Sequence, residues 1–420
     1  MLNKRPLTTL QKPVNLVNRE FNNNKYGYYE WLRDNDPVHK GKLTVMNFYY
    51  LSRYEDCVAL TKDPRFVRER SRALGKKSSA LPIPLPRSLE AMTNNMLMRD
   101  GADHRRLRDL VHQAFTPRRL AHLEARIETL TQNLLDNMQG KLVVDLKQDY
   151  CLPIPVTVIA EMLGIDYAEM QVFRQHLNAM TDTLTGLSAL KLVMKDLPAA
   201  RRYIESLIAK KRKAPAEDIL TGLIQAEAEG SRLSEDELIS MCFLLIVAGY
   251  ETTVYLLTNA ILCLLTHPEQ LDALKAQPEL IDGAIEESLR YLGPVQATKP
   301  YFASEEVTLH GVKIPRGAAV MPLLGAANHD PRQFENPEIF DITRSPNRHL
   351  GFSQGIHYCL GAPLARIEAR IALKNLWARY PDLRLAIEPE QLEMIHQPGW
   401  HKYKRLPVIP GDRTPAPPEG

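Results

Sequence analysis

The sequence predicts a mainly α-helical protein with a small β portion near each end. From about residue 104 to residue 292 the apolar residues recur at helical spacing almost without interruption. Residues 295–325 change to short strand-like runs separated by turn residues. The chain has 420 residues, of which 44% are hydrophobic and 25% charged, as is typical of a globular protein. No linker is evident, so we expect one large domain.

The two ends of the chain differ in composition from its middle. Residues 1–25 are polar, and we expect a loosely ordered N-terminal arm before a single domain at 26–411. Residues 412–420 are polar and rich in proline, and we expect a disordered tail because they have no means of burying a core. The first twenty residues contain no apolar segment, so neither a signal peptide nor a membrane anchor is expected.

The elements can be predicted in order along the chain. Short helices are expected at 28–34 and 54–61, on either side of a strand at 43–51. Residues 67–97 are basic and contain several prolines; they are either a binding loop or a surface loop without function. Within the helical region, four segments have helical periodicity: 120–138, 156–163, 167–184 and 197–213.

A long buried helix follows. Ser234 and Glu237 have the spacing of a capping box, and the helix should run to about Leu265, before His267-Pro268. Strands at 307–309 and 312–314 should then form a hairpin around a His-Gly turn, and a last helix should occupy 363–380.

Charge and cysteine usage exclude several classes of protein. The net charge of +3 is too small to predict nucleic-acid binding. Five cysteines, an odd number and widely scattered, predict neither a disulfide framework nor a metal site made of cysteine pairs. We therefore expect a protein of the reducing cytoplasm.

Cys359 is the most informative residue. It follows Gly355 and His357 on a glycine-rich turn and immediately precedes the last helix. Amide N–H groups at a helix start favour negative charge, so we expect a thiolate with a lowered pKa. A buried, inert cysteine and a Cys/His nucleophile are the alternatives.

The long helix contains a second signal. Polar residues at 249–253 interrupt its apolar sequence, and a glutamate in a buried helix is costly without a purpose. Thr252 can bond back to a carbonyl one turn earlier, and Gly249 removes a side chain where another group can approach. A transmembrane span and a simple glycine kink are the alternatives.

Two further pairs are spaced to share a helical face. Glu287 and Arg290 lie three residues apart and can form an ion pair, which by default is an ordinary surface pair. His104 and Arg108 lie four apart and together suit an anionic group, although a solvated basic face would look the same.

Taken together, these segments resemble the cytochrome P450 haem-thiolate monooxygenases, in matching order from about residue 26 to residue 408. Residues 352–361 resemble the cysteine-ligand loop, with Phe352 as its opening aromatic residue. Residues 248–252 resemble the oxygen-activating helix segment, and Glu287 with Arg290 resembles the structural Glu/Arg pair, with Arg344 as its third partner. The resemblance implies the cytochrome P450 fold.

The resemblance also implies roles. Cys359 would be the axial ligand of the iron of haem b. Glu251 and Thr252 would deliver protons to dioxygen, for which Gly249 beside Ala248 would leave room. The cofactor-binding residues would be His104, Arg108, Phe352, His357, Cys359 and Gly361. Glu287, Arg290 and Arg344 would be structural.

This sequence departs from the family pattern at two positions. Ser353 stands where the family most often has glycine, and because serine is also small we expect only a slight adjustment. Tyr301 stands where many bacterial members have an arginine that reaches a haem propionate, with Lys299 two residues earlier.

The expected reaction is insertion of one atom of dioxygen into a hydrophobic small molecule such as a terpenoid, steroid, fatty acid or polyketide. The electrons would come from a separate ferredoxin or flavodoxin and its reductase, docked on a basic face with Arg105, Arg106 and Arg366. Residues 81–85 would border the substrate pocket. Its other wall residues would be Phe243, Leu244, Val247, Val295, Gln296 and Trp400.

Two other functions remain open at this point: a peroxygenase that uses hydrogen peroxide directly, and a non-catalytic haem sensor. The paired Glu251 and Thr252 argue against both, because neither needs proton delivery to dioxygen.

Overall fold

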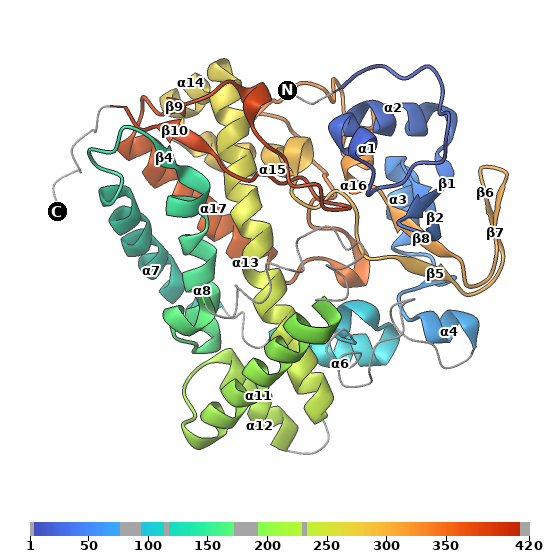
Figure 1. Cartoon of the computed structure of the whole chain (residues 1–420), viewed down its shortest axis with the longest axis horizontal. Helices are drawn as coiled ribbons and strands as arrows, with labels where there is room; N and C mark the ends of the chain where they lie inside the picture. Colours follow the sequence, from blue (N-terminus) through green and yellow to red (C-terminus); the bar gives the residue numbers. More distant parts are fainter. Residues whose placement is uncertain (1–3, 76–93, 113–116, 172–191, 229–232, 412–420) are drawn as a thin grey trace.

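The computed structural model describes residues 4–75, 94–112, 117–171, 192–228 and 233–411 (Figure 1). The α-helices are α1 (Arg19–Asn23), α2 (Lys25–Asn35), α3 (Tyr54–Leu60), α4 (Arg70–Leu74), α6 (Gly101–His112), α7 (Pro117–Asp136), α8 (Pro153–Leu163), α11 (Leu197–Lys213), α12 (Ile219–Ala228), α13 (Glu235–Thr266), α14 (Pro268–Ala276), α15 (Ile281–Leu292), α16 (Leu324–Ala327) and α17 (Ala362–Arg379). π-helical turns occupy Lys147–Cys151 (η2) and Leu192–Asp196. The mainly helical class predicted from the sequence is confirmed.

The strands form three small sheets. They are β1 (Val38–Leu43), β2 (Met46–Leu51), β3 (Phe66–Val67), β4 (Val144–Asp145), β5 (Tyr301–Ala303), β6 (Val307–Leu309), β7 (Val312–Ile314), β8 (Ala319–Pro322), β9 (Arg384–Leu385) and β10 (Pro407–Ile409). The largest sheet has the order β1-β2-β8-β5-β3, in which only the β2–β8 pair is parallel. The others are β4-β10-β9 and the hairpin β6-β7.

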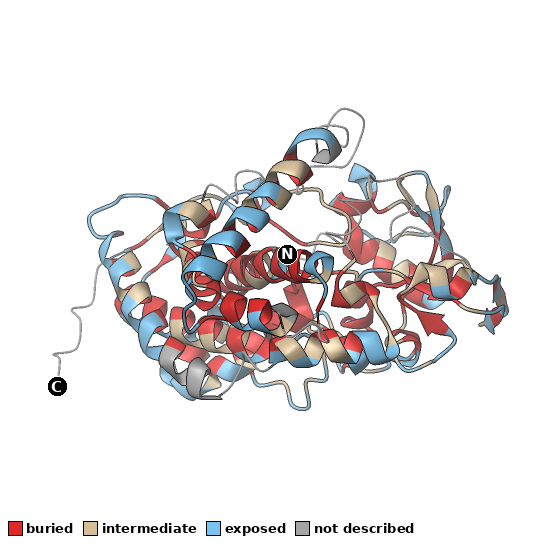
Figure 2. Cartoon of the chain, turned by 90° about the horizontal axis from the view of Figure 1, so that it is seen from below, coloured by how far each residue is buried: buried red, intermediate tan, exposed pale blue. Residues whose placement is uncertain are grey.

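Helix α13 is the central element of the fold. It begins with the predicted capping box, in which the Ser234 hydroxyl accepts from the Glu237 amide and the Glu237 carboxylate accepts from the Ser234 amide. It packs against α8, α15 and α17, and Figure 1 shows it crossing the middle of the molecule. Figure 2 shows that buried residues gather in the same central region. By length and composition it is apolar enough to cross a membrane, but 72% of its most apolar window is buried by the rest of the protein. Its apolar character is therefore that of a core helix.

The N-terminal segment differs from its prediction. Val14 and Leu16 are buried, and Asn15 pairs with Lys42 beside β1. Residues 14–16 are therefore bonded to Lys42 of β1, and the helix α1 follows them, instead of a loosely ordered arm. The strand predicted at 43–51 corresponds to β2, and the strand β1 before it was not predicted. Thr44 takes a positive φ of 57° and turns the chain between the two strands.

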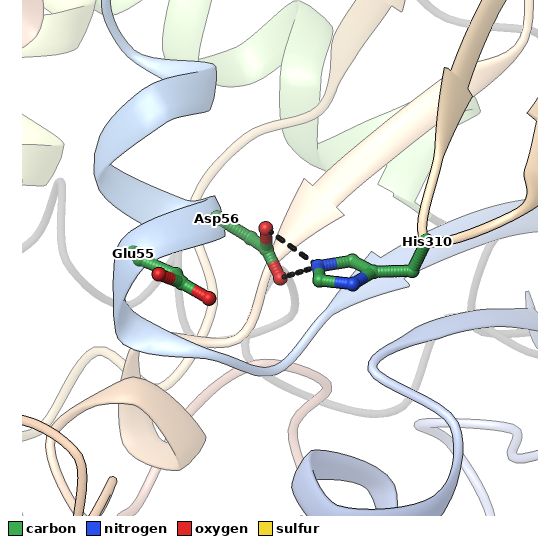
Figure 3. A group of neighbouring side chains, drawn as sticks. All are labelled: Glu55, Asp56 and His310. Atoms are coloured by element: carbon green, nitrogen blue, oxygen red, sulfur yellow. Dashed lines mark hydrogen bonds and ion pairs between the residues drawn. The ribbon is translucent and has the colours of Figure 1, made fainter.

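The β6-β7 hairpin has the predicted form and is attached to α3. His310 and Gly311 turn it with φ values of 48° and 77°. The His310 Nε2 lies 2.9 and 3.0 Å from the two carboxylate oxygens of Asp56 (Figure 3). Glu55 is close enough for the three side chains to offer metal ligands, with all ligand atoms within 4.8 Å of one another. The His310–Asp56 contact accounts for the grouping, because it fastens the hairpin to the helix.

Candidate active site

The loop before α17 holds the cysteine in a defined turn. The Cys359 amide donates to the Phe352 carbonyl at 3.0 Å, and Gly355 takes a φ of 71°. A Cβ at Gly355 would lie 2.9 Å from the Thr61 carbonyl oxygen, so glycine is needed there both for conformation and for space. Cys359 is exposed, whereas the other four cysteines are buried. The structure therefore singles out the same cysteine as the sequence.

The backbone conformation of Ser353, and not the size of its side chain, distinguishes this position. Its φ is 60°, in the left-handed region that favours glycine. The backbone of this turn is therefore the reason for the family's glycine, and the serine here bears the conformational cost.

The electrostatics of Cys359 correct one expectation. Although part of the residue is exposed, the surrounding protein removes the thiol from bulk solvent, and this raises its pKa. The N–H groups of Gly361 and Ala362 and the charges of Arg108 and Arg366 lower the pKa by less, so the pKa of the thiol is raised overall. The helix start alone therefore does not produce a thiolate. A bound metal would, because coordination displaces the thiol proton.

A buried group of polar side chains lies beside the cysteine loop. The rings of His104 and His357 meet edge to face, with their centroids 4.5 Å apart, and the His357 Nε2 is 4.0 Å from an Asp100 carboxylate oxygen. Burial, His357 and Arg108 lower the pKa of His104 to about 4, so this histidine is neutral at pH 7. Both ring nitrogens of His357 are buried without a hydrogen-bond partner. Such atoms are costly and indicate an absent partner.

Arg68 belongs to the same group and was missed by the sequence reasoning. Its guanidinium lies 3.6 Å from the centre of the Tyr301 ring, and its Nη1 donates to the carbonyls of Lys299 and Pro300. The Arg68 amide donates to Asp100 at 2.8 Å, while the buried Nε has no partner. An arginine therefore lies beside the position where this sequence has Tyr301, but it comes from the residue that follows strand β3, and nothing in the local pattern around residue 68 indicates this.

The predicted proton-delivery segment is accessible in an otherwise buried helix. Ala248 is exposed, and Glu251 and Thr252 are partly exposed, although the helix is buried on either side of them. The Thr252 hydroxyl donates to the Ala248 carbonyl at 3.1 Å, as the sequence suggested. Glu251 is bound by Lys402, a second residue that sequence reasoning missed.

Gly249 has a packing role that differs from the expected one. A Cβ at this position would lie 2.7 Å from the Ile159 Cδ1 of α8. The glycine therefore allows α13 and α8 to approach each other, and its missing side chain faces a helix instead of a space for dioxygen.

The predicted pocket residues divide into two groups. Phe243, Leu244 and Val247 follow one another on α13 toward the accessible segment, and Val295 pairs with Trp400 through a backbone bridge. Gln296 is different: its side chain is buried against Gly325 and donates to the Gly293 carbonyl. It therefore belongs to the core and is not a wall residue. Residues 81–85 lie outside the described part of the chain.

The predicted structural triad lies together. Arg290 Nε and Nη2 bind both oxygens of the fully buried Glu287 carboxylate at 2.8 and 2.7 Å, and Arg344 Nε binds one of them at 3.2 Å. Arg290 also donates to three backbone carbonyls: Asn328, Pro337 and Ile339. The arginine thus satisfies irregular backbone in the segment that leads to the cysteine loop.

The residues present fit a haem. The Cys359 sulfur is a metal ligand once deprotonated, and Arg108 acts electrostatically on Cys359, His104 and His357, which places these groups near one another. The unpartnered nitrogens of His357 and Arg68 match the carboxylates that a haem carries. We infer the fit from this donor set.

Comparison with known proteins also indicates a haem protein. The cytochrome P450 family model matches residues 38–381. The polyketide biosynthesis cytochrome P450 PksS of Bacillus subtilis (strain 168) is 41% identical over 394 residues, covering 93% of this chain and 96% of that protein. The cytochrome P450 monooxygenase PikC of Streptomyces venezuelae is 37% identical over 410 residues, covering 96% and 95%.

Solved structures agree with the sequence matches. The structure of PksS has a TM-score of 0.86 at 39% identity and covers 94% of this chain and 99% of that one. The crystal structure of P450BioI in complex with hexadec-9Z-enoic acid ligated acyl carrier protein has a TM-score of 0.84 at 37% identity, covering 93% and 99%. With its cysteine loop, its Glu/Arg triad and its fold, the chain belongs to the cytochrome P450 family of haem-dependent monooxygenases.

Proposed function

We propose that this protein inserts one atom of dioxygen into a C–H or C=C bond of a hydrophobic molecule and reduces the other atom to water. The reaction takes up a pair of electrons and two protons for each molecule of dioxygen. The observation that carries the proposal is the accessible Glu251–Thr252 segment in the middle of a buried helix. A partly buried acid and alcohol at the centre of a core helix are costly for stability and suit proton delivery to an enclosed site.

The side chains of the site would bind the cofactor and transfer protons. When bound, haem b with a cysteine thiolate supplies the oxygen-activating chemistry. Cys359 would provide the thiolate, with the amides of Gly361 and Ala362 donating to its sulfur. His104, His357 and Arg108 would hold the carboxylates. The Thr252 hydroxyl donates its hydrogen bond to the Ala248 carbonyl, which leaves the lone pairs of its oxygen free to accept a hydrogen bond from another donor.

The substrate we propose is a polyketide or a fatty acyl chain, in the wider class of hydrophobic molecules that includes terpenoids and steroids. The residues leading to the accessible segment on α13 are apolar: Phe243, Leu244 and Val247. The relatives named above include one assigned to polyketide biosynthesis and one solved with an acyl carrier protein that bears a fatty acid. Candidate substrates can be ranked by the change in the haem absorption spectrum when they bind.

The electron donor we propose is a separate ferredoxin or flavodoxin with its reductase, in the cytoplasm. Of the expected docking arginines, Arg106 is bound by Glu237 at 2.6 Å and Arg366 by Glu286, while Arg105 is exposed. Arg105 therefore has the charge most available to an acidic partner. Exposed Ile356 and Tyr358 beside Cys359 supply an apolar contact on the same loop.

The deciding experiment is the absorption spectrum of the reduced protein with carbon monoxide, for the wild type and for Cys359→Ser. A strongly red-shifted Soret band in the wild type, lost in the variant, is the result expected for thiolate-ligated haem. A band at the ordinary position, unchanged by the substitution, would overturn the assignment of Cys359 as the ligand.

A second substitution separates oxygen-dependent from peroxide-dependent turnover. In Thr252→Ala we expect electrons supplied by redox partners to leak to hydrogen peroxide instead of forming product. Turnover driven by added peroxide that is undiminished in this variant, in a protein inactive with redox partners, would instead indicate a peroxygenase. Ligand binding without product under either condition would indicate a sensor.

A further inference from the structure

Lys402 is a buried cation in direct contact with Glu251. Its side chain is completely buried, and its Nζ donates to the Glu251 Oε1 and to the Gln397 Oε1, each at 2.5 Å. Burial lowers the pKa of Lys402, while the Glu251 carboxylate raises it. A buried ammonium group is costly unless it is paired, so this contact is needed by both residues.

Aromatic rings enclose the ammonium group on its other sides. The Lys402 Nζ lies 3.8 Å from the centre of the Trp400 ring and 5.0 Å from that of Tyr255. Lys147 from η2 lies 5.2 Å from the same Tyr255 ring and donates to the Lys404 carbonyl at 2.9 Å. Within the part of the chain that the structure describes, the charged groups that act on Lys402 are therefore the Glu251 carboxylate and a further cation, Lys147. The rings hold the ammonium in place and keep water from it.

The contact uses only one of the two oxygens of Glu251. Among the described residues, Oε1 accepts from Lys402 and Oε2 has no hydrogen-bond partner. Glu251 is partly exposed and lies next to Thr252. The carboxylate is thus fixed at one oxygen, and the other oxygen is open to take a proton from water and pass it on.

We propose that Lys402 is a positioning residue that keeps Glu251 ionised and fixes its orientation, so that the free oxygen Oε2 relays protons toward Thr252. The inference rests on the proposed function for its meaning in the reaction. Its chemical content, the ionisation of Glu251, can be measured without turnover. The contribution of Lys402 follows from its position: a nearby positive charge favours a carboxylate, and a partly buried carboxylate without one is driven toward its neutral form.

Infrared spectroscopy provides a direct test, because a protonated carboxyl group absorbs apart from a carboxylate. Spectra are recorded as a function of pH for the wild type, Lys402→Met and Lys402→Arg, each compared with the same protein carrying Glu251→Gln. The difference between each pair isolates the titration of Glu251. Lys147→Met is the matched control, since it removes a neighbouring buried cation at the same Tyr255 ring but not the contact with Glu251.

We expect the titration midpoint of Glu251 to be higher in Lys402→Met than in the wild type, because the positive charge in contact with the carboxylate is lost. Lys402→Arg keeps the charge and should stay near the wild type, and Lys147→Met should not raise the midpoint. An unchanged midpoint in Lys402→Met would overturn the proposal. If that variant does not fold, Lys402→Gln takes its place, because its amide can still donate to Gln397 and Glu251.

Turnover then provides a second readout, which a purely structural role would not move. The fraction of reducing equivalents that reaches product, measured against pH, should fall in Lys402→Met at pH values where Glu251 has become protonated, and recover in Lys402→Arg. A shifted infrared midpoint in a protein without any product would leave the role of Lys402 in ionisation standing and contradict the proposed function. An unshifted infrared midpoint in a protein that forms product normally would contradict the role of Lys402 and leave the proposed function standing.

Discussion

Arg366 binds both carboxylate oxygens of Glu286, with Nε 2.6 Å from Oε1 and Nη2 2.8 Å from Oε2. The pair joins α15 to α17, the helix that begins just after Cys359. The His349 Nε2 lies 3.0 Å from the same carboxylate. These partners outweigh burial and lower the pKa of Glu286 to about 2. The helix that follows the cysteine is thereby tied to the helix that carries Glu287.

This pair predicts a pH-dependent contribution to stability. The folded-state pKa of Glu286 lies below that of an exposed glutamate, so its stabilising effect is full above about pH 4.5 and is lost as the pH falls toward 2. At neutral pH, Glu286→Gln should lower the free energy of unfolding by about 1–2 kcal/mol, after allowing for solvent screening. Denaturant unfolding of the wild type and of Glu286→Gln, from neutral pH down to the lowest pH at which both fold, measures the difference in their free energies of unfolding. A deficit that stays constant down to the lowest pH at which the protein folds would contradict the assignment.

Removing the charge of Glu287 should cost far more than removing a surface charge on the same helix. In Glu287→Gln, Arg290 and Arg344 lose their carboxylate in a buried site, and we expect a loss of about 3–5 kcal/mol and poor haem retention. Asp282→Asn is the control, because Asp282 binds Arg370 at 2.7 Å with both side chains exposed. That change should stay within about 1 kcal/mol. Equal effects in the two variants would contradict the structural role of the triad.

Two glycine-to-alanine changes on helices should have opposite signs. Gly249→Ala places a methyl group against Ile159 and should destabilise by about 1–3 kcal/mol. Gly222→Ala, on α12, meets nothing within 4 Å and should stabilise by about 0.5–1 kcal/mol. Thermal unfolding measures both. Ile159→Ala should relieve part of the cost of Gly249→Ala in the double variant, and strictly additive effects would refute the contact.

His357→Phe should affect the haem-free and haem-loaded proteins differently. Without haem, the change removes two buried, unpartnered nitrogens, so we expect equal or greater stability, by up to about 1–3 kcal/mol. With haem, a carboxylate loses its partner, and haem should transfer to a scavenging protein about tenfold faster, the effect of one charge-assisted hydrogen bond. Faster haem loss together with a destabilised haem-free protein would indicate a general packing defect instead.

The turn before the cysteine predicts a stabilising substitution. Ser353 has a φ of 60°, so Ser353→Gly should stabilise by about 1 kcal/mol by relieving the backbone. Gln354 next to it has extended backbone with a φ of −146°, and Gln354→Gly should destabilise. Unfolding of the two variants under identical conditions compares them, and a loss of stability in Ser353→Gly would show that the serine side chain makes a contact that outweighs the strain.

The features that the sequence predicted well depend on local rules. The capping box at Ser234, the hairpin turn at His310 and the ion pair of Glu287 with Arg290 join residues at most a few positions apart. Their spacing along the chain therefore determines their geometry. The cysteine loop is local in the same sense, since its glycines and Cys359 occupy ten consecutive residues.

The predictions that failed concern packing between distant segments. Residues 1–25 were expected to form a loosely ordered arm, but Val14 and Leu16 are buried where the chain bonds to Lys42 of β1. Gln296 looked like a pocket residue from its position after α15, but its side chain is buried against Gly325 and donates to the Gly293 carbonyl. Neither outcome can be seen in the local pattern, because each depends on what lies across the contact.

The sequence by itself determined the helical class, the family and the residues that resemble a haem-thiolate site. The tertiary structure decided which groups surround them: Lys402 against Glu251, Arg68 over Tyr301, and Ile159 against Gly249. The partners in each pair lie far apart along the chain and meet only because packing the core brings their helices and strands together. Local propensity carries no signal for such contacts, and their energies arise from burial and charge in the folded state.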